Sequence, residues 1–388
     1  MEYRELGSLV DRKIGYGIVQ PGQSVSGGVP VIKVNNIISG LYEISDLETT
    51  TLENDSKHSR TRLNGGELIV SVVGTIGKTA IVPNEFAGCN LVRATALIDI
   101  KSKWLTSWVK YYIDSKYGQD YIHQNLNTTV QPTLNIKSLV EMPIPFFDQV
   151  YMEKAVGILA SIDQRIENNK KINNNLEQQA HLIFASEFLR ADTPVGWTEA
   201  SLLDIADYLN GLAMQKFRPV DDEIGLPVLK IKELRQGFCD ESSELCSPSI
   251  KPVYIIDDGD VIFSWSGSLL VDFWCGGKCG LNQHLFKVTS TKFDKWFYYA
   301  WTKHHLQKFI AIAADMATTM GHIKREELSK AKVLIPSNDD YNRIGELLSP
   351  IYELIVANRK ESVKLAALRD ELLPRLMTGE IDLSEIDI

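Results

Sequence analysis

Two long stretches of the chain place apolar residues at intervals of seven, with a companion position four residues after several of them. In the C-terminal stretch the interval runs through Ile344, Ile351, Asn358, Leu365 and Leu372, with companions Leu348 and Ile355. The earlier stretch repeats it at Ala155, Ile162, Asn169, Leu176 and Ile183, with companions Leu159, Ile166 and Ala180. This spacing predicts two long helices that pair as a coiled coil, and the two stretches align at a constant offset of 189 residues.

An asparagine interrupts each apolar seam at the same place, Asn169 in the first stretch and Asn358 in the second. A buried Asn weakens packing but penalises pairings in other registers. We therefore expect these residues to help set how the two helices align. The alternative is two unrelated amphipathic helices, each with its Asn on a wet edge.

Short β-rich runs beside Gly or Pro also occur twice. Residues 30–34 are echoed by 227–231, and residues 66–71 by 259–264. These runs predict short strands and hairpins. An apolar strand ending in proline then precedes each long helix, at 142–145 and 333–336.

The repeat predicts an α+β fold in which two similar globular domains are each followed by a long helix, the helices pairing antiparallel. The expected segments are residues 1–148, 149–191, 192–337 and 338–388. A duplicated binding unit on a rigid double-helix spacer implies two target sites at a fixed separation, a geometry suited to a DNA duplex read in two places.

One proline disturbs the helical prediction. Pro350 falls inside the second helix, where a proline costs about 3 kcal/mol or more. Residues 341–349 are therefore either continuous with the helix or form a separate turn.

Composition adds limits to this picture. A chain of 388 residues with 44% hydrophobic residues exceeds what one core usually serves. The sequence has no run of 18 apolar residues and nothing like a secretory leader, so we expect a cytoplasmic protein. The net charge is −9, but residues 338–388 hold 6 basic against 11 acidic residues, so the excess lies mainly there. The nearly neutral first domain can still present a basic face to phosphates.

The five cysteines are expected to be reduced and structural. Cys275 and Cys279 are close in sequence, but a zinc knuckle needs four ligands at repeated short spacing. Cys239 and Cys246 fit that spacing poorly, so we expect no metal.

Catalytic motifs are weak. The chain has no Pro-Pro pair, which the base-holding element of an adenine methyltransferase would need. Residues 74–79 look briefly like a phosphate loop, but Val72 stands where the first Gly is required and residues 80–82 predict a strand. Asp55 and Lys57 lie in a polar stretch rather than on a nuclease strand. Four histidines lack a partnered Ser or Cys signature: His284, His304, His305 and His322.

The order of domain, helix, domain, helix resembles the specificity subunits of Type I restriction–modification systems over the whole chain. Residues 160–169 and 368–381 carry the most telling local matches. The resemblance implies two target recognition domains, each reading half of a bipartite site in double-stranded DNA. It further implies a coiled coil that measures the gap and docks two methyltransferase subunits, with restriction and translocase subunits in the same complex.

The same resemblance implies a chain without catalysis or a cofactor of its own. S-adenosylmethionine would then belong to the partner methyltransferase subunits. Whether those partners are separate or fused polypeptides is open. A duplicated coiled-coil scaffold that binds only proteins is the alternative from another class.

Candidate DNA contacts lie in polar loops. Arg and Lys can bind phosphates or guanine, amides can pair with adenine, and small hairpin residues let backbone N–H groups approach a phosphate. In the first domain the candidates are Lys57, His58, Ser59, Arg60, Arg62, Thr75, Lys78, Thr128, Thr129 and Gln131. In the second they are Lys216, Arg218, Ser266, Ser268, Asn282, Gln283, His284, Thr318, Thr319 and His322. Capping within the loops is the alternative role, and Trp265 and Trp274 are expected in the core.

Overall fold

The computed structural model describes residues 2–39, 44–100, 102–127, 132–315 and 322–386. Packing divides the chain into two compact units, which we call unit 1 and unit 2. Unit 1 comprises Met1–Asp163 with Ala367–Ile388, and unit 2 comprises Gln164–Ala366. The domain boundaries expected at residues 148, 191 and 337 remain predictions. No helix among the described residues is long and apolar enough to cross a membrane.

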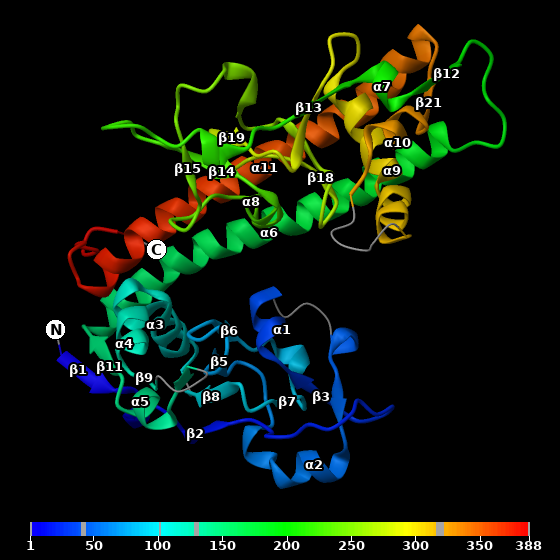
Figure 1. The fold of residues 1–388 in the computed structure, drawn as a ribbon. Helices are drawn as coiled ribbons and strands as arrows, with labels where there is room; N and C mark the ends of the chain where they lie inside the picture. The colour runs from blue at the N-terminus through cyan, green and yellow to red at the C-terminus, as the bar shows by residue number, and fades with distance from the viewer. Residues whose placement is uncertain (1, 40–43, 101, 128–131, 316–321, 387–388) are drawn as a thin grey trace. The chain divides into compact units, whose positions relative to one another are not determined.

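Unit 1 is built on a four-stranded antiparallel sheet in the order β2-β8-β5-β6, beside a three-stranded sheet β4-β3-β7 (Figure 1). Two-stranded ladders pair β1 with β11 and β9 with β10. The strands are β1 (Glu2–Glu5), β2 (Arg12–Tyr16), β3 (Val29–Ile32), β4 (Thr49–Thr50), β5 (Leu68–Ser71), β6 (Thr79–Ile81), β7 (Asn90–Leu91), β8 (Thr95–Asp99), β9 (Leu126–Asn127), β10 (Thr133–Leu134) and β11 (Pro143–Phe146). Its short helices are α1 (Val34–Ser39), α2 (Leu52–Lys57), α3 (Lys103–Asp114), α4 (Lys116–Gln124) and α5 (Ile136–Val140).

Unit 2 repeats this plan with sheets β13-β20-β17-β18 and β15-β14-β19-β16 and a ladder of β12 with β21. Its strands are β12 (Thr198–Ser201), β13 (Asp207–Asn210), β14 (Leu226–Leu229), β15 (Leu245–Cys246), β16 (Ile255–Ile256), β17 (Val261–Ser264), β18 (Leu270–Phe273), β19 (Cys279–Leu281), β20 (Leu285–Thr289) and β21 (Lys332–Ile335). Its short helices are α7 (Leu202–Ile205), α8 (Ile231–Gln236) and α10 (Arg325–Ser329), and α9 (Lys295–Asp315) is longer. The parallel pairs β3–β7 and β14–β19 occupy matching places, so the sequence repeat is a structural repeat.

The predicted strands at 30–34 and 227–231 each extend too far. Val34 and Ile231 are already the first residues of α1 and α8. The backbone N–H before each helix is bonded by a side chain three residues later, Lys33 by Asn36 and Lys230 by Glu233. Such bonds satisfy donors at a helix start, so each strand ends there.

The two long helices are α6 (Gln149–Phe188) and α11 (Asn338–Met377), each of 40 residues. The helix α11 continues through Pro350, so the separate turn considered for residues 341–349 does not form. Pro350 is exposed, while Leu348 before it and Ile355 after it are buried in the unit 2 core. Packing on both sides of the proline therefore outweighs the lost hydrogen bond.

The helices pair antiparallel in each unit, which confirms the predicted fold. In unit 1 the Tyr151 hydroxyl donates to the Leu376 carbonyl at 3.0 Å. In unit 2 Arg165 pairs with Glu361 at 3.1 Å, and farther along α6 Glu187 pairs with Arg343 at 2.9 Å. Partner numbers in α11 fall as numbers in α6 rise.

The pairing is polar in one section of unit 2. Asn169 donates to the Asn358 carbonyl at 3.3 Å and to Glu361 at 2.7 Å. The Asn358 amide in turn donates to Asn173 at 2.9 Å, and Asn173 donates to the Ile355 carbonyl at 3.3 Å. All three asparagines are buried. Of the other seam positions expected from sequence, Ile162 and Ile355 are buried and four are half-buried: Ile166, Leu176, Ile351 and Leu365.

Each end of the helix pair is built into the core of one unit. The unit 1 core includes Ala155 and Leu159 from α6 and Leu373 and Leu376 from α11. The unit 2 core includes Phe184 and Phe188 from α6 and Ile344 and Leu348 from α11. Burial of these side chains fixes the helices to the sheets of their own unit.

Candidate nucleic-acid interface

Four chain segments of unit 1 converge on a hydrogen-bonded junction at the ends of strands of the main sheet. The Arg93 N–H donates to the Ile18 carbonyl and the Val72 N–H to the Ala94 carbonyl, both at 2.8 Å. The Leu134 N–H donates to the Val72 carbonyl at 2.9 Å. We call this the unit 1 junction; it joins the ends of β2 and β5, the β7–β8 turn and the strand β10.

Unit 2 has the same junction. The Gln283 N–H donates to the Leu212 carbonyl at 2.8 Å, and the Trp265 N–H donates to the His284 carbonyl at 3.4 Å. The Ile323 N–H donates to the Trp265 carbonyl at 2.9 Å. We call this the unit 2 junction. Because each bond has its counterpart in unit 1, Gln283 corresponds to Arg93 and Trp265 to Val72.

The exposed chemistry of the unit 2 junction is aromatic and polar. The Trp265 ring stacks on Phe286 with centroids 5.6 Å apart, and its Nε1 donates to Asn210 at 3.0 Å. His284 and His322, both exposed, lie 6.1 and 6.3 Å from the Trp265 ring. Trp265 therefore lies at the edge of the core rather than inside it, whereas Trp274 is buried as expected.

Two other residues of this junction that were predicted to contact DNA instead make hydrogen bonds within the protein. Ser266, expected at an exposed hairpin tip, is buried, and its Oγ lies 3.1 Å from His284 Nδ1. Asn282 is also buried, and its Oδ1 accepts from the His284 N–H at 3.3 Å. Gln283 and His284 keep more of their surface, and Ser268 is half-buried with its carbonyl accepting from Ser264 at 2.8 Å.

The unit 1 junction is cationic by contrast. Arg93 and Lys78 are exposed, and neither side chain has an ion-pair or hydrogen-bond partner among the described residues. Thr75 is exposed on the tip between β5 and β6. The sequence reasoning missed Arg93; the signal was its alignment with Gln283 at an offset of 190 residues.

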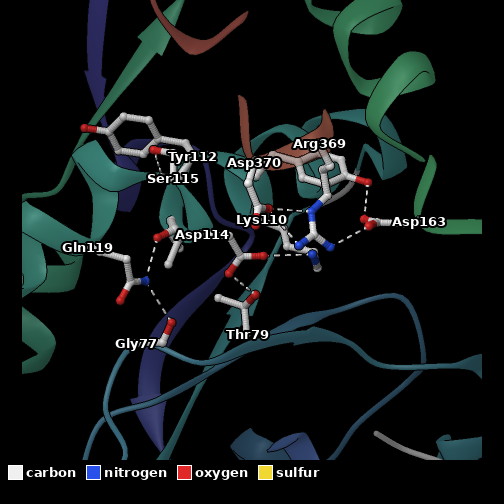
Figure 2. Close-up of polar contacts among 12 residues, drawn as sticks. Gly77, Thr79, Lys110, Tyr112, Asp114, Ser115, Gln119, Asp163, Arg369 and Asp370 are labelled. Atoms are coloured by element: carbon white, nitrogen blue, oxygen red, sulfur yellow. Dashed lines mark hydrogen bonds and ion pairs between the residues drawn. The ribbon is translucent and has the colours of Figure 1, made fainter. Parts of the chain in front are cut away.

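The hairpin tip of unit 1 is held from inside. Gly77 has a φ of 82°, which only glycine adopts easily, and its N–H donates to the Ser71 carbonyl at 2.9 Å. The Lys78 N–H donates to Ser71 Oγ at 2.8 Å. Figure 2 shows Gln119 of α4 donating to the Gly77 carbonyl, at 3.0 Å. A strand follows this tip rather than a helix, so the segment lacks the geometry of a nucleotide phosphate loop.

A polar cluster around a cavity of about 330 Å³ links this hairpin to the helix pair within unit 1 (Figure 2). Thr79 donates to Asp114 of α3 at 2.5 Å, and Lys110 pairs with the same carboxylate at 2.8 Å. On the same helix α3, one turn before Asp114, the Tyr111 hydroxyl donates to Asp163 of α6 at 2.8 Å. Arg369 of α11 pairs with Asp163 at 3.0 Å.

The surroundings of Tyr111 stabilise its protonated form. Burial, and then the Asp163 carboxylate, raise the pKa of Tyr111. The phenol therefore stays neutral and donates its hydrogen bond. With both cations paired, the cluster holds the hairpin, α3 and the two long helices of unit 1 in one arrangement.

Unit 2 achieves the same link through Arg359 of α11. Its guanidinium contacts Asp272 of β18 at 2.5 Å and Glu177 of α6 at 2.8 Å, while Lys303 of α9 pairs with Glu177 at 3.1 Å. Burial opposes the charge, but Asp272 and Glu177 outweigh it and raise the pKa of Arg359. Arg359 is thus a structural residue of unit 2.

The basic stretch 57–62 is largely neutralised. Arg62 pairs with the buried Asp55, Lys57 pairs with Glu53 at 2.7 Å, and His58 Nδ1 lies 2.9 Å from the Asn54 carbonyl. Burial alone would raise the pKa of Asp55, but hydrogen bonds from Arg62 and Asn90 lower it. Ser59 and Arg60 are exposed, and Arg60 is the cation here without an ion partner among the described residues.

The remaining candidates divide in two groups. Arg218 pairs with Glu244 at 2.9 Å, whereas Lys216 is exposed and has no ion partner in the described part of the chain. Five predicted residues lie outside the described residues: Thr128, Thr129, Gln131, Thr318 and Thr319.

The described cysteines are unpaired and nearly all buried. Burial raises the pKa of Cys275 to about 11 and raises that of Cys279 as well, so both thiols stay protonated. Within the described ranges no group of three or more Cys, His, Asp or Glu is placed to hold a metal ion.

A duplicated α+β unit with a matching loop junction in each copy, attached to an antiparallel helix pair, is the architecture of a two-domain recognition subunit. The family described as Type I restriction modification DNA specificity domain matches residues 1–178 and again 194–365, so the chain belongs to this family. As a specificity subunit the chain is non-catalytic, and catalysis resides in other subunits of the system.

Individual relatives agree with this assignment. The chain is 23% identical over 343 residues to the type I restriction enzyme MjaIX specificity subunit of Methanocaldococcus jannaschii, a match that covers 83% of this chain and 79% of the relative. It is 27% identical over 194 residues to the EcoBI specificity subunit of Escherichia coli, covering 48% and 40%. The crystal structure of a type I S subunit from M. genitalium has a similar fold, with a TM-score of 0.55, 14% identity and coverage of 96% and 95%.

Proposed function

We propose that the chain reads a bipartite site in double-stranded DNA, unit 1 recognising one half through its junction and unit 2 the other. The observation that carries this proposal is the junction itself, which is present twice with the same backbone bonds but different side chains. A shared scaffold with different exposed residues suits two half-sites of different sequence. The cytoplasm, where the DNA lies, is then the place of action.

Methylome sequencing of cells that express the chain with its neighbouring methyltransferase subunit tests this proposal. The expected result is a new methylated motif of two short halves around a fixed gap, absent from cells without the chain. A complex that purifies with the methyltransferase but yields no motif would instead favour a protein-binding scaffold.

The helix pair is proposed to set the gap between the half-sites. Insertion of seven residues into each helix, after Asp163 and before Ala367, keeps the seven-residue seam while lengthening each helix by about 10 Å. Because a base pair rises about 3.4 Å, the gap should grow by roughly three base pairs with both half-sequences unchanged. A motif with altered halves and the original gap would remove the ruler from the proposal.

The exposed faces of the helix pair are proposed to dock two methyltransferase subunits. In unit 2, Leu347 and Leu354 of α11 are each 46% exposed. The same helix lines a groove of about 410 Å³ with both acidic and basic side chains, Glu353, Lys360, Glu361 and Lys364. Ile172 and Leu182 of α6 are also exposed. Apolar residues on a charged helical surface favour a partner helix over water.

Charge reversals along these faces test the docking. Glu153→Arg, Lys170→Glu and Lys364→Glu alter exposed helix residues and are expected to reduce co-purification with the methyltransferase. Arg165 and Arg359 are unsuitable for this test, because their reversal would break the pair with Glu361 and the ion cluster of unit 2. Arg235→Glu, at an exposed position of α8, is the control that should leave the complex intact. Normal co-purification of all three helix variants would refute this docking surface.

A further inference from the structure

Arg93 and Gln283 occupy the same position of the same turn. The Thr95 N–H donates to the Val92 carbonyl at 2.9 Å, and in unit 2 the Leu285 N–H donates to the Asn282 carbonyl at 3.0 Å. Each bond closes a four-residue turn whose second residue is Arg93 or Gln283.

The backbone of this turn is held on both sides. Ile18 accepts from the Arg93 N–H and Leu212 from the Gln283 N–H, while Ala94 and His284 accept from the neighbouring hairpin. A residue whose backbone is fixed by flanking strands loses little additional backbone freedom when its side chain binds a ligand, so the entropy cost falls on the side chain alone. The turn therefore presents one side chain from a rigid platform in each unit.

The two side chains are available for binding. Arg93 is exposed without an acidic partner among the described residues, although most described arginines pair with Asp or Glu in this chain of net charge −9. The Gln283 side chain is half-buried, and its Nε2 makes a long contact of 3.3 Å with the adjacent His284 ring. Within the described ranges neither side chain joins one element of the fold to another.

The Arg93 and Gln283 side chains have different hydrogen-bonding groups, which match different bases of DNA. A guanidinium donates two parallel hydrogen bonds to O6 and N7 of guanine, whereas a carboxamide donates to N7 and accepts from N6 of adenine. Phosphate binding alone would suit Arg93 but would not explain a neutral amide at the equivalent position. Direct contact with base edges suits both residues.

We propose that Arg93 and Gln283 are matched base-reading residues, Arg93 specifying a guanine in one half-site and Gln283 an adenine in the other. This assignment rests on the proposed function, and it adds which residue discriminates which base in each half. The two residues act on opposite halves because they belong to different units.

Methylome motifs of the full chain, expressed with its methyltransferase partner, test the assignment. Arg93→Ala should relax one G·C position in one half by roughly ten- to a hundred-fold, and Gln283→Ala should relax one A·T position in the other half by a similar factor. Arg93→Gln should lose the guanine requirement while leaving the second half unchanged. The control is Arg235→Ala, which removes another exposed arginine that has no ion partner in the described part of the chain.

The outcomes separate the two proposals. A wild-type chain that directs no bipartite motif overturns the proposed function and the base assignment together. A wild-type bipartite motif that persists unchanged in both variants, with methylation weakened evenly over all sites, shows phosphate contact and overturns only the base assignment. Co-purification with the methyltransferase and an unaltered circular dichroism spectrum verify that each variant is folded.

Discussion

At the scale of single residues, the polar section of the helix pair shows how burial decides how much one amide side chain contributes to stability. Asn173 lies 6% exposed between the helices, where it accepts from Asn358 and donates to the Ile355 carbonyl. Asn174, the next residue, is exposed. A buried polar group that loses its partner carries a desolvation cost that an exposed one avoids.

Asn173→Ala should therefore lower the free energy of unfolding of the helix pair by about 1–3 kcal/mol, because the Asn358 amide is left buried without its acceptor. Asn174→Ala should change it by less than about 0.5 kcal/mol. Urea unfolding of the two variants gives the comparison. Equal effects would show that the polar section contributes nothing specific.

The sequence predicted Asn169 and Asn358 in the seam but did not predict Asn173. Asn169 contacts the Asn358 carbonyl, and the Asn358 amide donates to Asn173, one turn farther along α6. Seam periodicity identifies buried positions, but which side chains meet across the seam depends on the stagger of the helices.

A second residue-scale effect concerns the pKa of His304 in unit 2. The His304 ring packs against Phe184 and Trp301, at 5.3 and 5.6 Å, although part of the residue is exposed. Burial, and then His305 and His181, lower the pKa of His304 to about 4. The unfolded chain takes up this proton near pH 6.5, before the folded chain does.

Unit 2 should therefore lose stability as the pH falls from about 6.5 to about 4, and no further through this group below that range. His304→Gln should flatten the dependence of the unfolding free energy on pH in this window. Denaturant unfolding at pH 7.5 and 5.0 measures this dependence, with His123→Gln, at an exposed position of α4, as the control. An unchanged slope in His304→Gln would exclude the effect.

At the scale of elements, each unit ties its main hairpin to the long helices through a polar cluster that contains an arginine of α11. In unit 2 Arg359 makes the link directly, through Asp272 and Glu177. In unit 1 Arg369 joins α11 to α6 through Asp163, and the hairpin reaches this pair through α3, by the Thr79–Asp114 and Tyr111–Asp163 hydrogen bonds. The sequence predicted the hairpins and the helices from periodicity and turn residues. It did not predict these ion clusters, because they join residues separated by 87 to 206 positions.

Arg359→Ala should destabilise unit 2 by about 2–4 kcal/mol, because Asp272 and Glu177 remain partly buried without their cation. Arg375→Ala, on the same helix, removes only exposed pairs with Glu371 and Glu380 and should cost less than about 1 kcal/mol. Thermal unfolding of both variants tests the difference. A loss of similar size in both would mean that the Arg359 cluster is no stronger than a surface pair.

At the scale of the whole molecule, charge distribution matters more than net charge. The chain carries −9, yet Lys78 in unit 1 and Lys216 in unit 2 are exposed cations in the hairpin tip and just beyond the unit 2 junction. Such residues can neutralise phosphates locally whatever the total charge. The sequence located the polar loops, but only the fold showed which of their cations already pair with carboxylates. The candidate DNA-binding surface therefore could not be predicted from the sequence alone.

Binding of duplex DNA should weaken with salt, and each phosphate contact should contribute about −0.9 to the slope of log K against log salt concentration. Lys78→Ala and Lys216→Ala should each make that slope shallower by about 1 while leaving the preferred sequence unchanged. Fluorescence anisotropy of the chain in its methyltransferase complex over a salt series provides the measurement. Lys57→Ala, which removes a lysine already paired with Glu53, is the control.

Because unit 1 is built from two separate segments of the chain, it cannot be completed until the ribosome has synthesised the C-terminal segment. Its core takes Leu373, Leu376, Met377 and Leu383 from the C-terminal segment, and the Leu383 carbonyl accepts from Lys154 at 3.1 Å. Unit 2, by contrast, is one continuous segment. Unit 2 can therefore complete its fold during translation while unit 1 waits for residues 367–388. A prematurely terminated chain would lack a complete unit 1, so the order of synthesis limits the release of chains in which only unit 2 is folded.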